Sequence, residues 1–100
     1  MSALPLSYTT EKIFKSLGYP DPLVAARQQA RMILLGRRSR YQAEIQQLQA
    51  KWHCNLDEMR QKYQAQAHED FAADEDYLSW QWYDDAIKAV DEQLDILARE

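Results

Sequence analysis

The side chains best suited to catalysis in this 100-residue sequence are two histidines and one cysteine. His53 and Cys54 are neighbours, and adjacent side chains on a helix point about 100° apart, so they do not form a nucleophile–base pair. His68 could join them only if the chain folds back, and the spacing of the three matches no zinc pattern. There is no glycine-rich phosphate loop and no serine elbow. We therefore expect no catalytic residue, no metal and no cofactor, and we expect that the protein is not an enzyme.

Carboxylates and aromatic rings are concentrated between residues 69 and 85. Trp and Tyr are the side chains most enriched at binding hot spots, and carboxylates beside stacking rings imitate the phosphates and bases of a nucleic acid. This pattern predicts a surface for a basic protein, with the carboxylates mainly raising the association rate. The expected partner-binding residues are Tyr77, Trp80, Trp82, Tyr83, Asp70, Asp74, Glu75, Asp76 and Asp84.

The acidic and aromatic segment also fits two purely structural roles. Acidic residues near the start of a helix could simply complement its dipole. The rings could also be covered by a short helix elsewhere in the chain, either the one with Ile13, Phe14 and Leu17 or the one with Met59 and Tyr63. In the second case the aromatic residues would form part of the core.

Charge is unequal between the two halves of the chain. Residues 1–50 have seven basic and three acidic side chains, whereas residues 51–100 have five basic and 13 acidic ones. Arg27, Arg31 and Arg38 lie on one stripe of the first half, where they could bind phosphate or pair within the chain with Asp84, Asp91 and Glu92. We favour pairing within the chain, because the net charge of -4 makes long-range attraction to nucleic acid weak.

The sequence predicts an all-α protein. Four helices are expected at about residues 9–17, 22–53, 56–67 and 76–99, from their periodicity and their start and stop signals. Gly18 favours a left-handed end to the first helix, and Asp21 and Asn55 are good caps for the second and third. Glu58 completes a capping box with Asn55, and Asp74 is the expected cap of the last helix.

The two long helices have apolar stripes that predict their packing. One stripe is Leu34, Tyr41, Ile45, Leu48 and Trp52, and the other is Trp80, Tyr83, Ile87, Val90, Leu94 and Leu97, which has coiled-coil spacing. We expect an elongated antiparallel helical hairpin, coiled-coil-like, with two short accessory helices. The seam from Trp80 to Leu97 could instead form a homodimer.

Length and composition set the remaining limits. A chain of 100 residues fits one domain, and a single cysteine forms no disulfide within the chain, so a cytoplasmic location is expected. The longest aliphatic run, Met32 to Leu35, is far shorter than the roughly 20 residues of a membrane span, so no membrane association is expected.

Several stretches of the chain resemble a known group of proteins. These stretches are LGYPDP at 17–22, ARMILLGRRSRYQAEIQQLQAKW at 30–52, ED at 69–70 and DYLSWQW at 76–82. The chain resembles small all-helical prokaryotic proteins encoded beside toxin genes, which are presumed antitoxins of two-gene toxin–antitoxin systems. The resemblance implies a protein that binds and silences a partner, often a ribonuclease, and that binds its own promoter as part of the complex. The sequence has no recognisable helix-turn-helix or ribbon-helix-helix segment for the promoter role.

The function expected from the sequence is therefore that of a non-catalytic protein-binding module, an antitoxin-like neutraliser of a basic toxin. A self-associating structural module that uses the Trp80–Leu97 seam is the alternative. Binding of nucleic acid through Arg27, Arg31 and Arg38 is the least favoured of the three.

Overall fold

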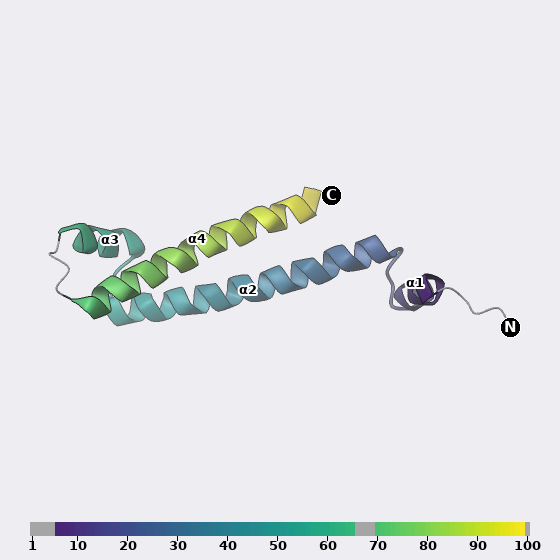
Figure 1. The fold of residues 1–100 in the computed structure, drawn as a ribbon, viewed down its shortest axis with the longest axis horizontal. Helices are drawn as coiled ribbons and strands as arrows, with labels where there is room; N and C mark the ends of the chain where they lie inside the picture. The colour runs from purple at the N-terminus through teal and green to yellow at the C-terminus, as the bar shows by residue number, and fades with distance from the viewer. Residues whose placement is uncertain (1–5, 66–69, 100) are drawn as a thin grey trace. The chain divides into compact units, whose positions relative to one another are not determined.

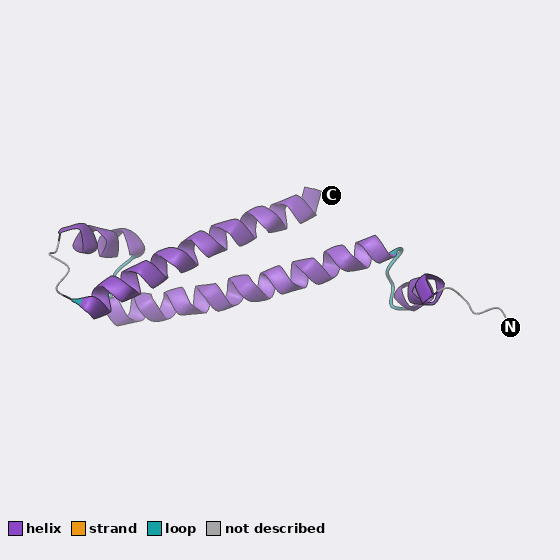
Figure 2. Ribbon diagram, viewed as in Figure 1, coloured by secondary structure: helices purple, strands orange, loops and turns teal. Residues whose placement is uncertain are grey.

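The computed structural model describes residues 6–65 and 70–99, and within these ranges the regular structure is entirely helical, as expected. The helices are α1 (Leu6–Ser16), α2 (Pro22–Trp52), α3 (Leu56–Ala65) and α4 (Phe71–Arg99) (Figures 1 and 2). The chain divides into two compact units, Met1–Ile33 and Leu34–Glu100, with α2 running from one into the other. We describe each unit by itself.

In the first unit, α1 ends at a glycine in the left-handed conformation, as the sequence predicts. Gly18 has φ of 94°, and its N–H donates to the carbonyl of Lys15 at 3.0 Å. The N–H of Tyr19 donates to the carbonyl of Phe14 at 3.0 Å, and the two rings meet edge to face with centroids 6.5 Å apart. These two hydrogen bonds and the apolar contact form a Schellman motif, which satisfies carbonyls that the helix end leaves without partners.

The start of α2 is also capped as predicted. The Asp21 carboxylate accepts a hydrogen bond from the N–H of Val24 at 2.9 Å, and the Asp21 carbonyl accepts one from the N–H of Ala25 at 3.2 Å. Pro22 occupies the first helical position, where its missing N–H has no cost.

In the second unit, a short turn joins α2 to α3. His53 ends α2 in a left-handed conformation with φ of 54°, and its N–H donates to the carbonyl of Gln49 at 2.8 Å. Asn55 then caps α3: its side-chain oxygen accepts from the N–H of Glu58 at 2.9 Å, and the Glu58 carboxylate accepts from the N–H of Asn55 at 3.4 Å. The predicted capping box is confirmed, and it fixes the direction in which α3 leaves the turn.

The start of α4 differs from the prediction. The helix begins at Phe71 and not near residue 76, because Asp70 and not Asp74 is its cap. The Asp70 carboxylate accepts from the N–H of Ala73 at 3.2 Å, and the Asp70 carbonyl accepts from the N–H of Asp74 at 3.1 Å. Both aspartates are suited to capping, so residue type alone does not distinguish them.

The core of the second unit lies where α3 covers the first turns of α4. Met59, Tyr77 and Trp80 are 2%, 9% and 1% exposed, and they form a single buried cluster. Partly buried side chains from α2, the turn, α3 and α4 pack around it: Ile45, Leu48, Trp52, Cys54, Leu56, Tyr63 and Ala73. Both predicted stripes face inward, since all their members in the second unit are buried or half-buried.

Polar contacts join α2 to α4 within this unit. Arg38 Nε donates to Asp91 Oδ1 at 2.7 Å, and Trp52 Nε1 donates to Asp76 Oδ2 at 2.8 Å. Trp52, which comes after Arg38 in α2, thus contacts Asp76, which comes before Asp91 in α4. The contact between Trp52 and Asp76 therefore links the C-terminal end of α2 to the first turns of α4.

Candidate interaction surface on α4

The four aromatic residues predicted to bind a partner have different environments. Tyr77 and Trp80 are buried in the core, so they are not surface anchors in this fold, and that part of the prediction is corrected. Tyr83 is half-buried. Only Trp82 is well exposed, at 58%.

Helix α3 is the physical reason for the burial of Tyr77. The rings of Tyr63 and Tyr77 stack with centroids 4.4 Å apart and an interplanar angle of 27°. Arg60 Nε donates to the Tyr77 hydroxyl at 3.3 Å, and Arg60 Nη2 donates to Gln81 Oε1 at 2.8 Å. The hydrogen bond to Tyr77 raises the pKa of Arg60 further above its ordinary value. The sequence left open whether the helix with Met59 and Tyr63 covers the aromatic residues of the last helix. In the structure this helix, α3, covers the ring of Tyr77.

Trp82 projects beside the α2–α4 contact and is braced by two tyrosines. Its ring meets that of Tyr41 edge to face, with centroids 5.5 Å apart, and that of Tyr83 in the same manner at 5.3 Å. Leu78, Ser79, Trp82 and Tyr83 line a shallow open depression on α4. The ring is therefore held in place by neighbours while more than half of it faces solvent, which lowers the entropy lost when it binds something.

Trp82 belongs to a longer exposed stripe that the sequence patterns above did not single out. Phe71, Leu78 and Ile96 are 84%, 56% and 54% exposed, and Ala89 is also exposed. At about 100° per residue these side chains and Trp82 point within about 40° of one another. We call Phe71, Leu78, Trp82, Ala89 and Ile96 the outer stripe. The sequence shows the seven-residue spacing of the outer stripe, but the Trp80–Leu97 seam of the same helix has heptad spacing too.

The predicted acidic residues divide between structural and exposed positions. Asp70 caps α4, and Asp84 forms an ion pair with Lys88 on the same helix at 3.1 Å. Asp74 is half-buried and lines a hollow near the core, and Glu75 is exposed. Two further acidic residues, Asp85 and Glu92, are exposed on α4 close to the outer stripe.

Asp76 has an internal role. Its carboxylate accepts hydrogen bonds from Trp52 Nε1 at 2.8 Å and pairs with Lys51 Nζ at 2.6 Å. Burial alone would raise the pKa of Asp76, but the hydrogen bonds from Lys51 and Trp52 outweigh burial and place it below the ordinary value. We therefore remove Asp76 from the partner-binding surface, because the side chain is half-buried and its Oδ2 atom already contacts both Trp52 and Lys51 of α2.

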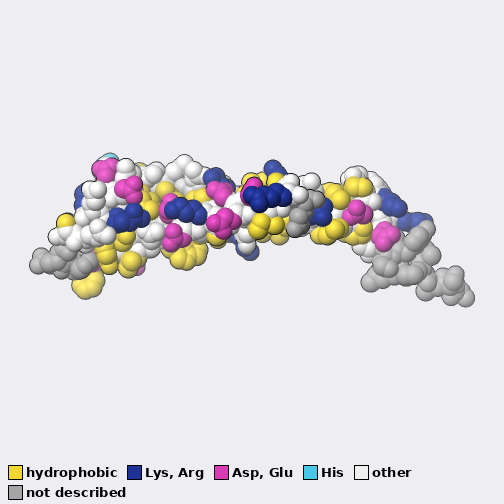
Figure 3. All heavy atoms as spheres, turned by 90° about the horizontal axis from the view of Figure 1, so that it is seen from above, with side chains coloured by type: hydrophobic (Ala, Val, Ile, Leu, Met, Phe, Trp, Pro, Cys, Tyr) yellow, Lys and Arg dark blue, Asp and Glu magenta, His cyan; other side chains and the backbone are white. Residues whose placement is uncertain are grey.

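Only one of the three stripe arginines is shown to pair with an acidic residue of α4. Arg38 contacts both oxygens of Asp91, at 2.7 and 3.4 Å, and this hydrogen bonding raises the pKa of Arg38 further. Arg27 and Arg31 lie in the first unit, and the Arg27 Nε atom is buried without a hydrogen-bond partner. On the face shown in Figure 3, basic side chains lie among acidic ones and hydrophobic side chains lie between them.

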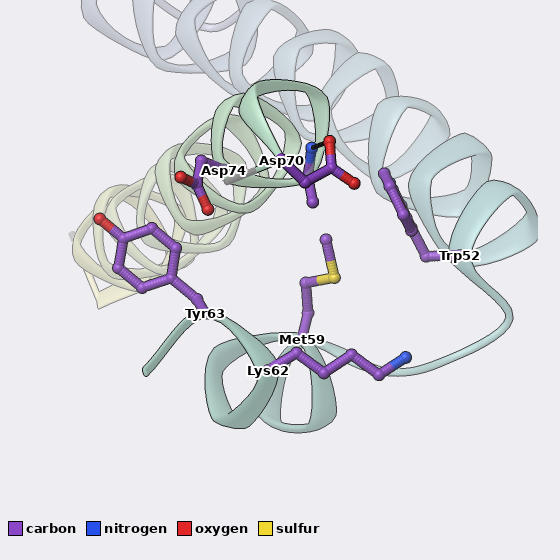
Figure 4. A pocket seen from close by; sticks show the side chains of 7 residues that line it. Trp52, Met59, Lys62, Tyr63, Asp70 and Asp74 are labelled. Atoms are coloured by element: carbon purple, nitrogen blue, oxygen red, sulfur yellow. Dashed lines mark hydrogen bonds between the residues drawn. The ribbon is translucent and has the colours of Figure 1, made fainter. Parts of the chain in front are cut away.

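The residues considered for chemistry do not assemble in the described part of the chain. His53 is exposed and Cys54 is half-buried against the core, while His68 and Glu69 lie outside the described residues. Among residues 6–65 and 70–99, no group of three His, Cys, Asp or Glu side chains could hold a metal ion. A hollow of about 200 Å³ near the core is lined by Trp52, Met59, Tyr63, Asp70 and Asp74, among others. In Figure 4, Met59 points between Trp52 and Tyr63, and Asp70 and Asp74 lie opposite.

Comparison with known proteins adds no relative: no family model, curated protein or solved structure matches the chain. No described helix is long and apolar enough to cross a membrane.

Proposed function

We propose that this protein is a non-catalytic protein-binding module that binds a basic partner through the exposed aromatic and acidic surface of α4. In this proposal α2 and α4 form an antiparallel hairpin whose purpose is to hold that surface rigid. The class of activity we favour is neutralisation of a basic toxin of the ribonuclease type, in the manner of an antitoxin.

The observation that supports this proposal most is the position of Trp82. A tryptophan that is 58% exposed yet braced by Tyr41 and Tyr83 is unusual for a side chain that serves only folding, because burial is the main source of its stabilising energy. Trp is the residue type most enriched at hot spots, and Glu75 and Asp85 give its surroundings a negative potential that attracts basic proteins.

The alternative of self-association through the Trp80–Leu97 seam is less well supported. Trp80 is 1% exposed and Val90 is 5% exposed within a single chain. A homodimer through this seam would first have to open contacts that one chain already makes. Nucleic-acid binding through Arg27, Arg31 and Arg38 is also less well supported, because the guanidinium of Arg38 is already paired with Asp91.

Affinity capture from the native cell with quantitative mass spectrometry tests the proposal. The baits are the unchanged protein, Trp82→Ala, and Leu35→Ala, which removes a hydrophobic side chain that is 45% exposed on α2. We expect a small basic protein to be captured by the unchanged protein and by Leu35→Ala and to be lost with Trp82→Ala. The purified pair should then bind in solution, more weakly as salt rises. Equal capture by all three baits would contradict the proposal.

A further inference from the structure

We infer that the group of the partner that Trp82 binds is an arginine side chain, whose guanidinium stacks on the indole ring. This inference rests on the proposed function and adds to it the chemical class of the group that α4 recognises. The site consists of the depression lined by Leu78, Ser79, Trp82 and Tyr83 and of the carboxylates of Glu75 and Asp85 beside it.

The exposed line of α4 that contains Trp82 mixes apolar and acidic residues. Glu75, Asp85 and Glu92 take the same helical positions as the members of the outer stripe, and all three are exposed. No Lys or Arg lies on this line between Phe71 and Ile96. An apolar group placed here would take carboxylates partly out of water without giving them a partner, which is unfavourable. A long cationic side chain suits the line better, because its hydrocarbon stem can lie on apolar residues while its charged head reaches a carboxylate.

The depression presents the indole ring of Trp82 as a fixed platform. Leu78 and Ser79 precede Trp82 by four and three residues, and side chains on a helix lean towards its N-terminus, so the indole lies over their turn. The rings of Tyr41 and Tyr83 meet the indole at interplanar angles of 85° and 83°, which restricts its rotation. Trp attracts a cation to its face more strongly than any other aromatic side chain. The ring is therefore held in place for such a contact before the partner arrives.

Two carboxylates lie within reach of a cation on this platform. Glu75 precedes Leu78 and Ser79 by three and four residues, which places it one turn before the depression. Asp85 follows Trp82 by three residues, and its Oδ1 atom accepts a hydrogen bond from Gln81 Nε2 at 3.2 Å, which helps to orient it. A cation over the indole would thus have a carboxylate on either side along the helix.

Arginine fits this site better than lysine. The guanidinium is planar and weakly hydrated, so it can stack on a ring while the N–H groups at its edge donate to carboxylates. An ammonium group is strongly hydrated and has no flat face. Ser79, which lines the same depression, can accept a further N–H through its hydroxyl oxygen. The site should therefore prefer arginine to lysine and reject an uncharged side chain of the same shape.

Three labelled peptides that differ in one residue type test this inference. Each is a flexible Gly-Ser peptide with arginine, lysine or citrulline at every third position, and citrulline is the uncharged isostere of arginine. Fluorescence anisotropy measures their binding to the unchanged protein and to Trp82→Phe, Trp82→Leu and Phe71→Leu. Phe71→Leu is the matched control, because it removes an exposed ring of the same helix that does not line the depression. Circular dichroism checks that each variant is folded.

We expect the arginine peptide to bind about threefold more tightly than the lysine peptide and at least about tenfold more tightly than the citrulline peptide. Trp82→Leu should weaken binding of the arginine peptide about fivefold, Trp82→Phe should weaken it less, and Phe71→Leu should leave it unchanged. Equal binding of the arginine peptide and either other peptide would overturn the inference. A loss with Phe71→Leu as large as that with Trp82→Leu, or no loss with Trp82→Leu, would overturn it as well. So would a concentration-dependent dimer of the protein that Trp82→Leu abolishes, because a second copy would then occupy the depression.

The two proposals fail in different ways. If Trp82→Ala abolishes capture of a basic native partner while Trp82→Leu retains it, the proposed function holds and the arginine contact does not. If neither substitution affects capture, both are refuted.

Discussion

Trp80 and Trp82 are two residues apart on α4, yet the structure gives them opposite roles, and replacing each by alanine tests this assignment. Trp80 is 1% exposed in the core with Met59 and Tyr77, so Trp80→Ala should cost about 4 kcal/mol of the free energy of unfolding. Trp82 is 58% exposed, so Trp82→Ala removes less than half as much buried area and should cost about 1 to 2 kcal/mol, including its contact with Tyr41.

Urea unfolding followed by circular dichroism at 222 nm measures both effects. With a denaturant slope of about 2 kcal/mol per M for a small protein, the midpoint should fall by about 2 M for Trp80→Ala and by less than about 1 M for Trp82→Ala. Capture of the partner should show the reverse order, with the larger specific loss in the folded Trp82→Ala protein. If Trp80→Ala were no more destabilising than Trp82→Ala, the assignment of Trp80 to the core would be refuted.

Four further substitutions or conditions test the helix caps and the contact between α2 and α4. Trp52→Phe removes the N–H that donates to Asp76 and should cost about 1 kcal/mol; a double-mutant cycle with Asp76→Asn measures this, and additive losses would count against the hydrogen bond. Because the pKa of Asp76 lies below its ordinary value of 3.8, the ionised carboxylate should stabilise the fold above that pH, and this contribution should be lost as the pH falls further. Asp76→Asn should therefore flatten the acid part of a plot of unfolding free energy against pH. An unchanged plot would disprove this. Asn55→Ala should cost about 1 kcal/mol by removing the cap of α3, with faster amide exchange in α3 as the readout, and unchanged exchange would contradict the capping role. Gly18→Ala should destabilise the end of α1 by about 1 kcal/mol because φ is 94°, and a helix content and melting curve equal to those of the unchanged protein would argue against this.

Local signals in the sequence predicted much of the secondary structure. Gly18, Asp21 and Asn55 cap helices as expected, because a cap depends on a few neighbouring residues whose hydrogen bonds are fixed by their spacing. The two apolar stripes, Leu34 to Trp52 and Trp80 to Leu97, are buried or half-buried as predicted, since apolar periodicity along a helix directly reflects burial. The start of α4 was placed too late because several aspartates precede the seam and each is a competent cap.

The candidate surface could be predicted only in part. The sequence identified Trp82 and its acidic surroundings, but it could not separate Trp82 from Trp80 and Tyr77, because the first turns of α4 are aromatic on most sides. Which rings are covered depends on α3, whose Tyr63 and Arg60 contact Tyr77 of α4. Such contacts between separate helices follow from tertiary packing and have no signature in the spacing along one helix.

The central claim is that a basic partner contacts the exposed face of α4, and site-specific photocrosslinking tests it most directly. A photoreactive phenylalanine analogue is placed at Leu78, which is 56% exposed beside Trp82, or at Leu35 on α2 as the matched control. We predict that irradiation in the native cell joins a small basic protein to position 78 and not to position 35. Crosslinks to that protein from position 35 alone, or to a second copy of this chain from position 78, would contradict the claim.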